Sequence, residues 1–285
     1  MIDRRELEAI REGRARPADL ASIVMAHYRT EELVRLCLRA VRRLTDHPFE
    51  TIVVDNNSGD GSLEYLRRVG WIRLIERGPE AEPDAVTAHA AAMDVGLAAA
   101  RGRWLVSLHT DTILRRAGWL GELLVRLRSA PNAACLGAGK LDADPAWYAV
   151  LKRLLDARRA KAAFCRALGL PFNPEHGEAA WYPRSYCAIY DLDCVRRLGL
   201  SFRAAPGSRT GERLYRGLLE AGYAAVRLAP AEMARYVDHV AHATALLARG
   251  GLDHWRGNRK VRRALRRVLA TDLARELLAD DSLDL

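Results

Sequence analysis

The feature that most constrains the fold is an alternation of short apolar runs and helical patterns between residues 19 and 140. Apolar runs with strand-like length lie at 19–27, 49–54, 71–75, 104–108 and 133–137. Helical patterns lie between them, at about 30–44, 62–69, 84–100 and 117–127. Strands that alternate with helices in this way are typical of a parallel, doubly wound sheet. The sequence therefore predicts an α/β fold with a mainly parallel central sheet flanked by helices.

The rest of the chain is less regular, and we expect four segments in all. Residues 1–18 predict a lead helix, 19–140 the first half of the domain, 141–248 its second half, and 249–285 a helical tail. The second half contains one long helical pattern with a basic face, at 148–168. Shorter elements are expected after it, at 185–190 (strand), from 191 (helix), 212–222 (helix) and 224–228 (strand).

Composition narrows the class of protein. The formal net charge is +9, from 45 Lys and Arg against 36 Asp and Glu. Such a balance suits nucleic acid, an anionic membrane or a phosphorylated substrate, and also plain solvated helix faces. No run approaches the ~18 apolar residues of a membrane span. The N-terminus has no apolar signal core, and five cysteines lack CxxC spacing, so we expect reduced thiols in a cytoplasmic protein.

Polar side chains follow three of the expected strands where each strand ends. In a parallel sheet these ends share one edge, where α/β proteins bind ligands. Asp55 could accept from a ribose hydroxyl or a base N–H, or form an Asx-turn. Asp111 could bind a divalent cation, or act as a turn residue. The polar residues at these ends are His27, Tyr28, Asp55, Asn57, Ser58, His109, Thr110 and Asp111.

These segments resemble family 2 glycosyltransferases with the GT-A fold. The resemblance rests on SIVMAHYRTEELVRLCLRAV, FETIVVDNNSGDGSLEYL and AHAAAMDVGLAAARGRWLVSLHTDT, and it extends more weakly over residues 183–245. It implies a nucleotide diphosphate sugar as donor, a Mg²⁺ or Mn²⁺ cofactor, and a saccharide, lipid-linked or small-molecule acceptor. The residues that it assigns to the nucleotide are Ala26, His27, Tyr28, Asp55, Asn57, His89, Thr110 and Arg184.

The metal motif departs from the family pattern. The family's Asp-x-Asp reads His109-Thr110-Asp111 here, so the resemblance makes Asp111 the metal ligand. His109 could be a second ligand, a donor to a phosphate, or a packed residue. The family's late histidine corresponds to His239, with His242 as a weaker candidate. Three residues apart, these two would share a face if they lay on a helix.

The catalytic base also departs from the pattern. The family's Glu-Asp pair opens a helix, but those positions read Thr210-Gly211 here. The nearest carboxylate, Glu212, is therefore the candidate base for an inverting transfer. It could instead be a first-turn residue that favours the helix dipole. Arg184 could bind a diphosphate with two N–H groups or form a surface salt bridge.

The leading hypothesis is an inverting, metal-dependent glycosyltransferase. A nucleotidyltransferase would need a Gly-rich phosphate loop, and residues 22–30 contain no glycine. A catalytically degenerate member that serves as a binding or partner module is the alternative, because the first Asp and the Glu-Asp pair are missing. We expect no nucleic-acid partner. The basic segments 148–168 and 252–267 leave peripheral contact with the inner membrane face open, and a homodimer is also left open.

Overall fold

The computed structural model describes residues 19–79, 84–141, 181–203, 209–241, 243–248 and 255–285. The expected lead helix at 1–18, the basic helix at 148–168, Cys165 and His242 lie outside these residues. The other four cysteines are buried thiols without a disulfide.

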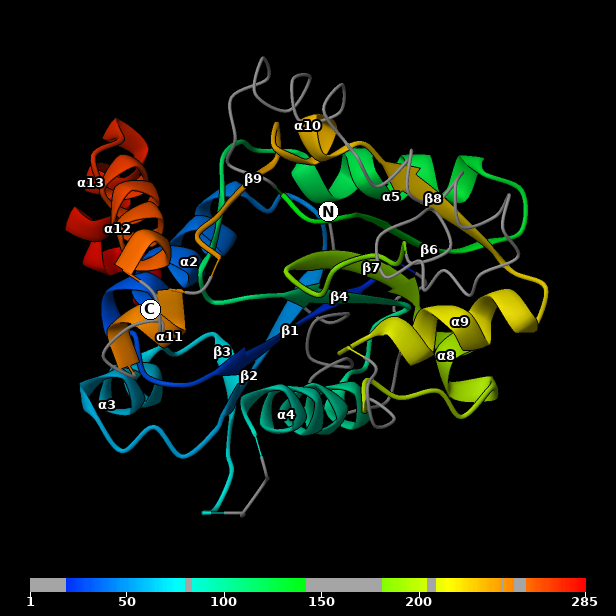
Figure 1. Cartoon of the computed structure of the whole chain (residues 1–285), viewed down its shortest axis with the longest axis horizontal. Helices are drawn as coiled ribbons and strands as arrows, with labels where there is room; N and C mark the ends of the chain where they lie inside the picture. Colours follow the sequence, from blue (N-terminus) through cyan, green and yellow to red (C-terminus); the bar gives the residue numbers. More distant parts are fainter. Residues whose placement is uncertain (1–18, 80–83, 142–180, 204–208, 242, 249–254) are drawn as a thin grey trace, which may run out of the picture.

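A seven-stranded sheet forms the centre of the molecule, in the order β3-β2-β1-β4-β7-β6-β8 (Figure 1). Only β7 runs antiparallel to its neighbours, β4 and β6. The prediction of a mainly parallel sheet is therefore confirmed. The strands are β1 (Ala21–His27), β2 (Phe49–Asp55), β3 (Ile72–Glu76), β4 (Trp104–Leu108), β6 (Ala133–Ala138), β7 (Cys187–Asp191) and β8 (Ala224–Leu228).

Helices cover both faces of this sheet (Figure 1). The expected helical tail is present as α12 and α13. The helices are α2 (Glu31–Leu44), α3 (Gly61–Arg68), α4 (Ala85–Ala99), α5 (Trp119–Ser129), α8 (Leu192–Arg197), α9 (Glu212–Glu220), α10 (Pro230–Met233), α11 (Ala243–Ala248), α12 (Trp255–Leu269) and α13 (Asp272–Ala279), with a final 3₁₀ turn η2 (Asp281–Asp284). None of these described helices is long and apolar enough to cross a membrane.

Each central strand contributes to two apolar cores, because successive side chains point to opposite faces. In β1, Ile23 and Met25 join the core that contains α2, α5 and the C-terminal helices. Val24 and Ala26 join the core beneath α4, α8 and α9. A Cβ atom at Gly96 would lie 2.2 Å from a methyl carbon of Val24, so the small residues of α4 allow its close approach to β1.

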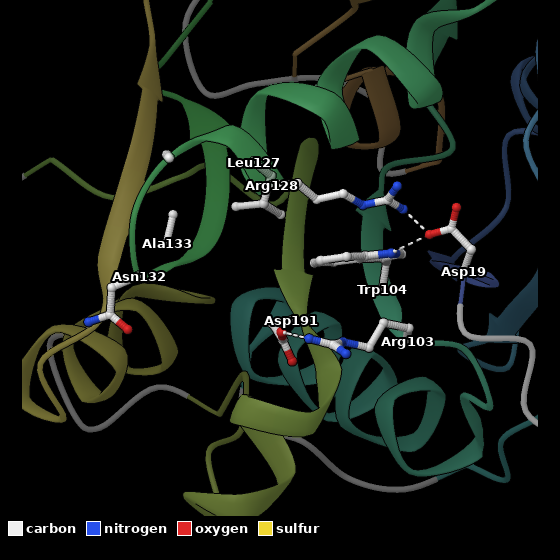
Figure 2. A pocket seen from close by; sticks show the side chains of 9 residues that line it. Asp19, Arg103, Trp104, Leu127, Arg128, Asn132, Ala133 and Asp191 are labelled. Atoms are coloured by element: carbon white, nitrogen blue, oxygen red, sulfur yellow. Dashed lines mark hydrogen bonds and ion pairs between the residues drawn. The ribbon is translucent and has the colours of Figure 1, made fainter.

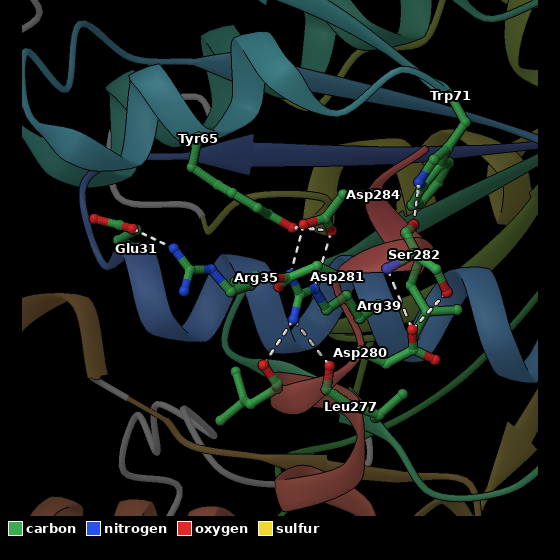
Figure 3. Close-up of polar contacts among 12 residues, drawn as sticks. Glu31, Arg35, Arg39, Tyr65, Trp71, Leu277, Asp280, Asp281, Ser282 and Asp284 are labelled. Atoms are coloured by element: carbon green, nitrogen blue, oxygen red, sulfur yellow. Dashed lines mark hydrogen bonds and ion pairs between the residues drawn. The ribbon is translucent and has the colours of Figure 1, made fainter.

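The C-terminal turn is fastened to α2 by a buried guanidinium (Figure 3). All three nitrogens of Arg39 donate: to Asp284 at 2.6 and 3.0 Å, to Asp281 at 2.5 Å, and to two backbone carbonyls at the end of α13. Tyr65 donates to Asp284 at 2.8 Å, and Trp71 to the Leu283 carbonyl at 2.7 Å. The tail is thereby tied to the first half of the domain.

Two local features differ from what the residue types suggest. Threonine commonly caps a helix N-terminus, but Thr30 precedes α2 in a left-handed conformation (φ 75°), and its hydroxyl makes no capping hydrogen bond. His239 does not lie on a helix: it ends a short strand, β9 (Val237–His239), which pairs antiparallel with β5 (Thr112–Leu114). Neither of these two strands was expected from the sequence. Together they form a second sheet that continues directly from the His-Thr-Asp motif.

Candidate active site

The expected polar strand ends meet at one edge of the sheet. His27 at the end of β1 lies in register with Asp55 at the end of β2. The strand β4 ends one residue before His109. The His-Thr-Asp tripeptide then turns into β5, with Thr112 N–H donating to the His109 carbonyl at 3.0 Å. The chain therefore brings the imidazole and the carboxylate of this motif to the carboxyl edge of the sheet.

The second small sheet brings His239 to the same place. Thr112 is its register partner across the β5–β9 pair, and the Val240 N–H donates to the Asp111 carbonyl at 2.9 Å. His239 Nε2 lies 3.4 Å and His109 Nδ1 3.7 Å from Asp111 Oδ1. One ligand atom from each of the three residues lies within 4.8 Å of the others. This triad of His109, Asp111 and His239 is the candidate metal centre.

Neighbouring side chains hold the two imidazoles. Ser185 Oγ lies 2.9 Å from His109 Nε2, which leaves Nδ1 facing Asp111. The Tyr186 ring stacks on His239 with centroids 4.7 Å apart and planes 16° from parallel. The second ring nitrogen of a metal-bound histidine is usually held by a hydrogen bond, as Ser185 holds that of His109. The triad is therefore oriented before any ligand arrives.

The protonation states of the triad suit a cation. Burial alone would raise the pKa of Asp111, but the neighbouring His239, with His109, outweighs it and lowers that pKa below its ordinary value. Burial, with the neighbouring His89, holds the pKa of His109 well below its ordinary value. The carboxylate is thus ionised and the imidazole of His109 neutral, as metal ligation requires.

Three buried polar atoms in or beside the triad lack a hydrogen-bond partner among the described residues. They are Oδ1 of Asp111, Nε2 of His89 and Oγ1 of Thr112. The His89 ring lies edge-on to His109, with centroids 4.7 Å apart. An unpaired buried polar group costs about 1–3 kcal/mol. One carboxylate oxygen between two imidazole nitrogens fits a divalent cation, so the residues present suit the metal that the resemblance implies.

The comparisons with known proteins bear on this geometry. The family model described as Glycosyl transferase family 2 matches residues 22–187. The chain belongs to this family. It is a glycosyltransferase with a His-Thr-Asp variant of the family's metal motif. No curated protein sequence matches the chain.

Several solved structures resemble this glycosyltransferase at low sequence identity. Residues 1–349 of TarS from S. aureus are 13% identical and superpose with a TM-score of 0.51, over 88% of this chain and 72% of that one. A mannosyltransferase from Pyrobaculum calidifontis, solved with GDP-Man and Mn²⁺, is 18% identical (TM-score 0.49; 93% and 79% covered). Glucosyl-3-phosphoglycerate synthase from Mycobacterium tuberculosis is 18% identical (TM-score 0.46; 93% and 82% covered). The TarS likeness supports the fold alone.

The residues expected at the nucleotide are distributed along the same edge of this glycosyltransferase. Asp55 is buried, and both its oxygens accept from Ser58: Oδ1 from the hydroxyl at 2.5 Å and Oδ2 from the N–H at 2.9 Å. Its carboxylate therefore closes the turn over residues 55–58, with a bond one residue longer than that of the Asx-turn left open as an alternative. Asn57, within that turn, is exposed and left-handed, with φ 58°. These contacts leave the nucleotide role of both residues a prediction.

The other expected nucleotide residues differ in how far they are buried. His27 is wholly buried, and its Nε2 lies 2.8 Å from Ser62 Oγ at the start of α3. Ala26 and Thr110 are 9% and 5% exposed. Tyr28 is half-buried beneath the Arg29 guanidinium, which lies 5.1 Å from the ring centroid. Only Tyr28 of these four presents appreciable surface at the strand edge.

Arg184 contacts Tyr182, and the charge of Glu212 acts on the same tyrosine. The Arg184 guanidinium lies 4.3 Å from the Tyr182 ring centroid and donates to its hydroxyl. Burial raises the pKa of Tyr182, and the charges of Arg184 and Glu212 also act on it. Glu212 begins α9, where it pairs with Arg216 at 2.5 Å and retains 16% side-chain exposure. Because Ser185 follows Arg184, this group is connected to the triad along the chain.

Three residues that support the triad were missed by the sequence reasoning. Ser185 and Tyr186 contact its imidazoles, and the Cys37 thiol on α2 lies 3.6 Å from the His109 carbonyl. Ser185 directly follows Arg184, which the sequence already assigned to the nucleotide site. This position was the signal that could have identified it. His242, the weaker late-histidine candidate, lies outside the described residues.

A cavity of about 640 Å³ lies at the opposite edge of the sheet (Figure 2). It borders Trp104, the first residue of β4, whereas Asp111 follows the last. Arg128 pairs with Asp19, and Arg103 with Asp191 at 2.6 Å. Both guanidinium groups lie over the Trp104 ring, 5.2 and 5.3 Å from its centroid. The polar lining is thus internally paired and distant from the candidate metal centre along β4.

Proposed function

We propose that this chain is an inverting, metal-dependent glycosyltransferase. It moves a sugar from a nucleotide diphosphate sugar to the hydroxyl of a saccharide, lipid-linked or small-molecule acceptor. The observation that carries the proposal is the ionised Asp111 carboxylate, buried between two imidazoles, with one oxygen that no described donor satisfies. A buried carboxylate oxygen that accepts no hydrogen bond is expensive, so a cation is its expected complement.

His109, Asp111 and His239 would hold the cation. When bound, a Mg²⁺ or Mn²⁺ supplies Lewis-acid neutralisation of the diphosphate leaving group. Carboxylate and water ligands suit Mg²⁺, whereas imidazole ligands suit transition metals. Two imidazoles in the triad therefore support a preference for Mn²⁺ over Mg²⁺.

The nucleotide would lie along the strand edge. Tyr28 and Asn57 offer surface there, while Ala26 and Thr110 form the close-packed floor. Asp55 keeps the turn around Asn57 in shape through its two bonds to Ser58, and it is the family's expected nucleotide contact. His27 supports this edge from beneath through Ser62. His89, with one unpaired ring nitrogen, and Arg184 would donate to the diphosphate.

Glu212 is the proposed base. Its carboxylate would take the acceptor hydroxyl proton as that oxygen attacks the anomeric carbon. The new C–O bond forms as the bond to the diphosphate breaks on the opposite face, which inverts the configuration. The contact between Glu212 and Arg216 must open first, and Arg216 is 61% exposed, so water can replace it.

Turnover of a donor panel tests the proposal. UDP-, GDP- and dTDP-sugars are incubated with Mn²⁺, Mg²⁺ or EDTA, and nucleotide release and the anomeric configuration of the product are measured. We expect release with one nucleotide, dependent on the cation, with inversion. Glu212→Gln should abolish turnover but keep nucleotide binding, and Glu220→Gln on the same helix is its matched control.

Two results would contradict this function. A product with retained configuration would exclude the inverting mechanism and the role of Glu212. No hydrolysis or transfer with any donor, together with no cation-dependent nucleotide binding in calorimetry, would leave the catalytically degenerate binding module as the better account.

A further inference from the structure

The outer face of α12 carries a concentrated positive charge. No acidic residue occurs between positions 255 and 271. The helix lies at the outer edge of the molecule, beside α13 (Figure 1). Its exposed cations are Arg259, Lys260, Arg262, Arg263, Arg266 and Arg267. We propose that this face is an electrostatic docking surface for an anionic lipid membrane.

The arginines of α12 differ from most exposed arginines elsewhere in the protein. Arg35 pairs with Glu31, Arg67 with Glu76, and Arg275 with Asp272, at 2.5 to 2.7 Å. By contrast, the five exposed arginines of α12 form no ion pair or hydrogen bond within the described residues. No residue in the described part of the chain therefore neutralises their charge.

The spacing of these arginines makes them repel one another. Neighbours four residues apart share a helix face, and like charges there destabilise the helix. Three such pairs occur: Arg259 with Arg263, Arg262 with Arg266, and Arg263 with Arg267. A solvated face needs no such concentration of one sign. An anionic surface would turn this repulsion into attraction.

The inner face of α12 determines how it would bind. Val261 and Val268 are buried at 5% and 4% exposure, and Ala264 and Leu265 pack against the same core. These apolar side chains are part of the folded protein, so they are not available for insertion between lipids. Attachment would therefore be electrostatic, sensitive to salt and insensitive to membrane curvature.

The composition of this face favours lipid over nucleic acid. A cluster of four to eight Lys and Arg on an amphipathic helix is the pattern that attracts anionic headgroups. Single-stranded nucleic acid is usually bound with aromatic stacking, and base edges are read by amide or hydroxyl side chains. Among the described side chains of α12, every exposed position is a cation.

Co-sedimentation with vesicles tests the surface without donor, metal or acceptor. The full chain is mixed with vesicles of about 30% phosphatidylglycerol in phosphatidylcholine, or with pure phosphatidylcholine, at low salt. We expect binding only to the anionic vesicles, with release at about 0.5 M NaCl. Arg262→Glu with Arg266→Glu should weaken binding about tenfold or more.

The matched control is Arg68→Glu with Arg213→Glu. These two arginines are exposed on α3 and α9 and give the same change in net charge. Circular dichroism and a melting curve confirm that each double variant is folded. Equal loss in the control would mean that net charge, not α12, attracts the vesicles. The proposal is overturned by that result, by no binding to anionic vesicles, or by tighter binding to duplex RNA of equal phosphate concentration that the α12 variant removes.

Discussion

Arg39 and Asp111 are both buried charges, but the protein satisfies only one of them. All three nitrogens of Arg39 donate to carboxylates and carbonyls of the C-terminal turn, and its side chain is 2% exposed. Asp111 is buried to 9% side-chain exposure, yet no described donor bonds its Oδ1. We call the Arg39 group a closed cluster, because the protein itself supplies all of its partners, and such a cluster stabilises the fold. We call the Asp111 triad an open cluster, because one oxygen accepts no hydrogen bond from a described residue and can bind a ligand.

The difference gives opposite expectations for stability. Removing one partner of a closed, buried pair leaves the other charges uncompensated and is strongly destabilising. Removing the charge from an open cluster relieves its desolvation cost, so the metal-free protein should lose little stability. Substitutions at Arg39 should therefore lower stability, whereas substitutions at Asp111 should lower metal binding and activity.

The largest effect should follow from Asp111→Asn. Loss of the only carboxylate in the triad should abolish Mn²⁺ binding and reduce transfer by about a thousandfold or more, since metal stabilisation of a leaving diphosphate contributes several kcal/mol. Calorimetry with Mn²⁺ and steady-state turnover measure these effects. The melting temperature of the metal-free protein should stay the same or rise.

Asp238→Asn is the matched control for this variant. Asp238 precedes His239 on β9, but its carboxylate lies 3.4 Å from Arg115 rather than in the triad. It should keep metal binding and turnover near the wild-type values. Two results would contradict the interpretation of the triad as an open cluster. One is normal Mn²⁺ binding by Asp111→Asn, and the other is a loss of stability in the metal-free variant as large as that expected for Arg39→Met.

Arg39→Met should have the next largest effect, and on stability alone. It leaves Asp281 and Asp284 without their shared partner, and we expect the free energy of unfolding to fall by about 3–5 kcal/mol. Urea denaturation followed by circular dichroism measures the loss. Any variant that remains folded should bind Mn²⁺ with unchanged affinity.

Arg43→Met is the comparison for Arg39. Arg43 lies one turn further along α2 and pairs with Glu276 at 3.3 Å, but both side chains are exposed, at 43% and 58%. Exposed pairs contribute about 0–1 kcal/mol. Equal destabilisation by the two substitutions would mean that burial does not explain the importance of the Arg39 cluster.

Ser185→Ala should have a moderate effect on the metal. The hydroxyl fixes His109 through Nε2, and loss of such a supporting contact usually weakens metal affinity about 10- to 100-fold. Calorimetry should show weaker Mn²⁺ binding, while the melting temperature changes little. Ser185→Thr keeps a hydroxyl and should restore much of the affinity. Unchanged affinity in Ser185→Ala would mean that packing alone orients His109.

The sequence predicted the regular half of the molecule because periodicity carries that information. The apolar runs of β1, β2 and β4 and the helices between them were found to within a few residues. The position of Asp111 at a strand end then predicted the edge of the sheet where the candidate metal centre lies. The helical tail was also expected, although its attachment through Arg39 was not, because a single arginine within a helix gives no sign of a distant carboxylate.

The details of the candidate site were harder to predict. The strands β5 and β9 are each three residues long and pair across a large separation in sequence, so neither shows a pattern of its own. The strand that places His239 was therefore not predicted. Thr30 has a side chain suited to capping, but its left-handed backbone directs it elsewhere. The direction of β7 is likewise a tertiary property that no local pattern contains.

His27 should show the smallest effect. It is intermediate between the closed and the open cluster, because only one of its two ring nitrogens has a described partner. Its Nε2 is satisfied by Ser62, but its Nδ1 has no described partner. Burial lowers the pKa of His27 to about 4, and the charges of Asp55 and Asp60 oppose that shift only in part. An unfolded histidine has a pKa of about 6.5, so between these values the unfolded chain binds the extra proton and the folded state does not.

Acidification should therefore destabilise the protein through His27. From pH 7 to pH 5.5 we expect a contribution of about 1 kcal/mol, which develops below pH 6.5 and levels off near pH 4. Other buried histidines add to the total, so the informative quantity is the difference between wild type and His27→Gln, measured by urea denaturation in EDTA at several pH values. The variant should lose stability less steeply with falling pH. Parallel curves would mean that His27 is protonated equally in both states. Water would then reach its unpaired nitrogen, whereas the unpaired oxygen of Asp111 is enclosed.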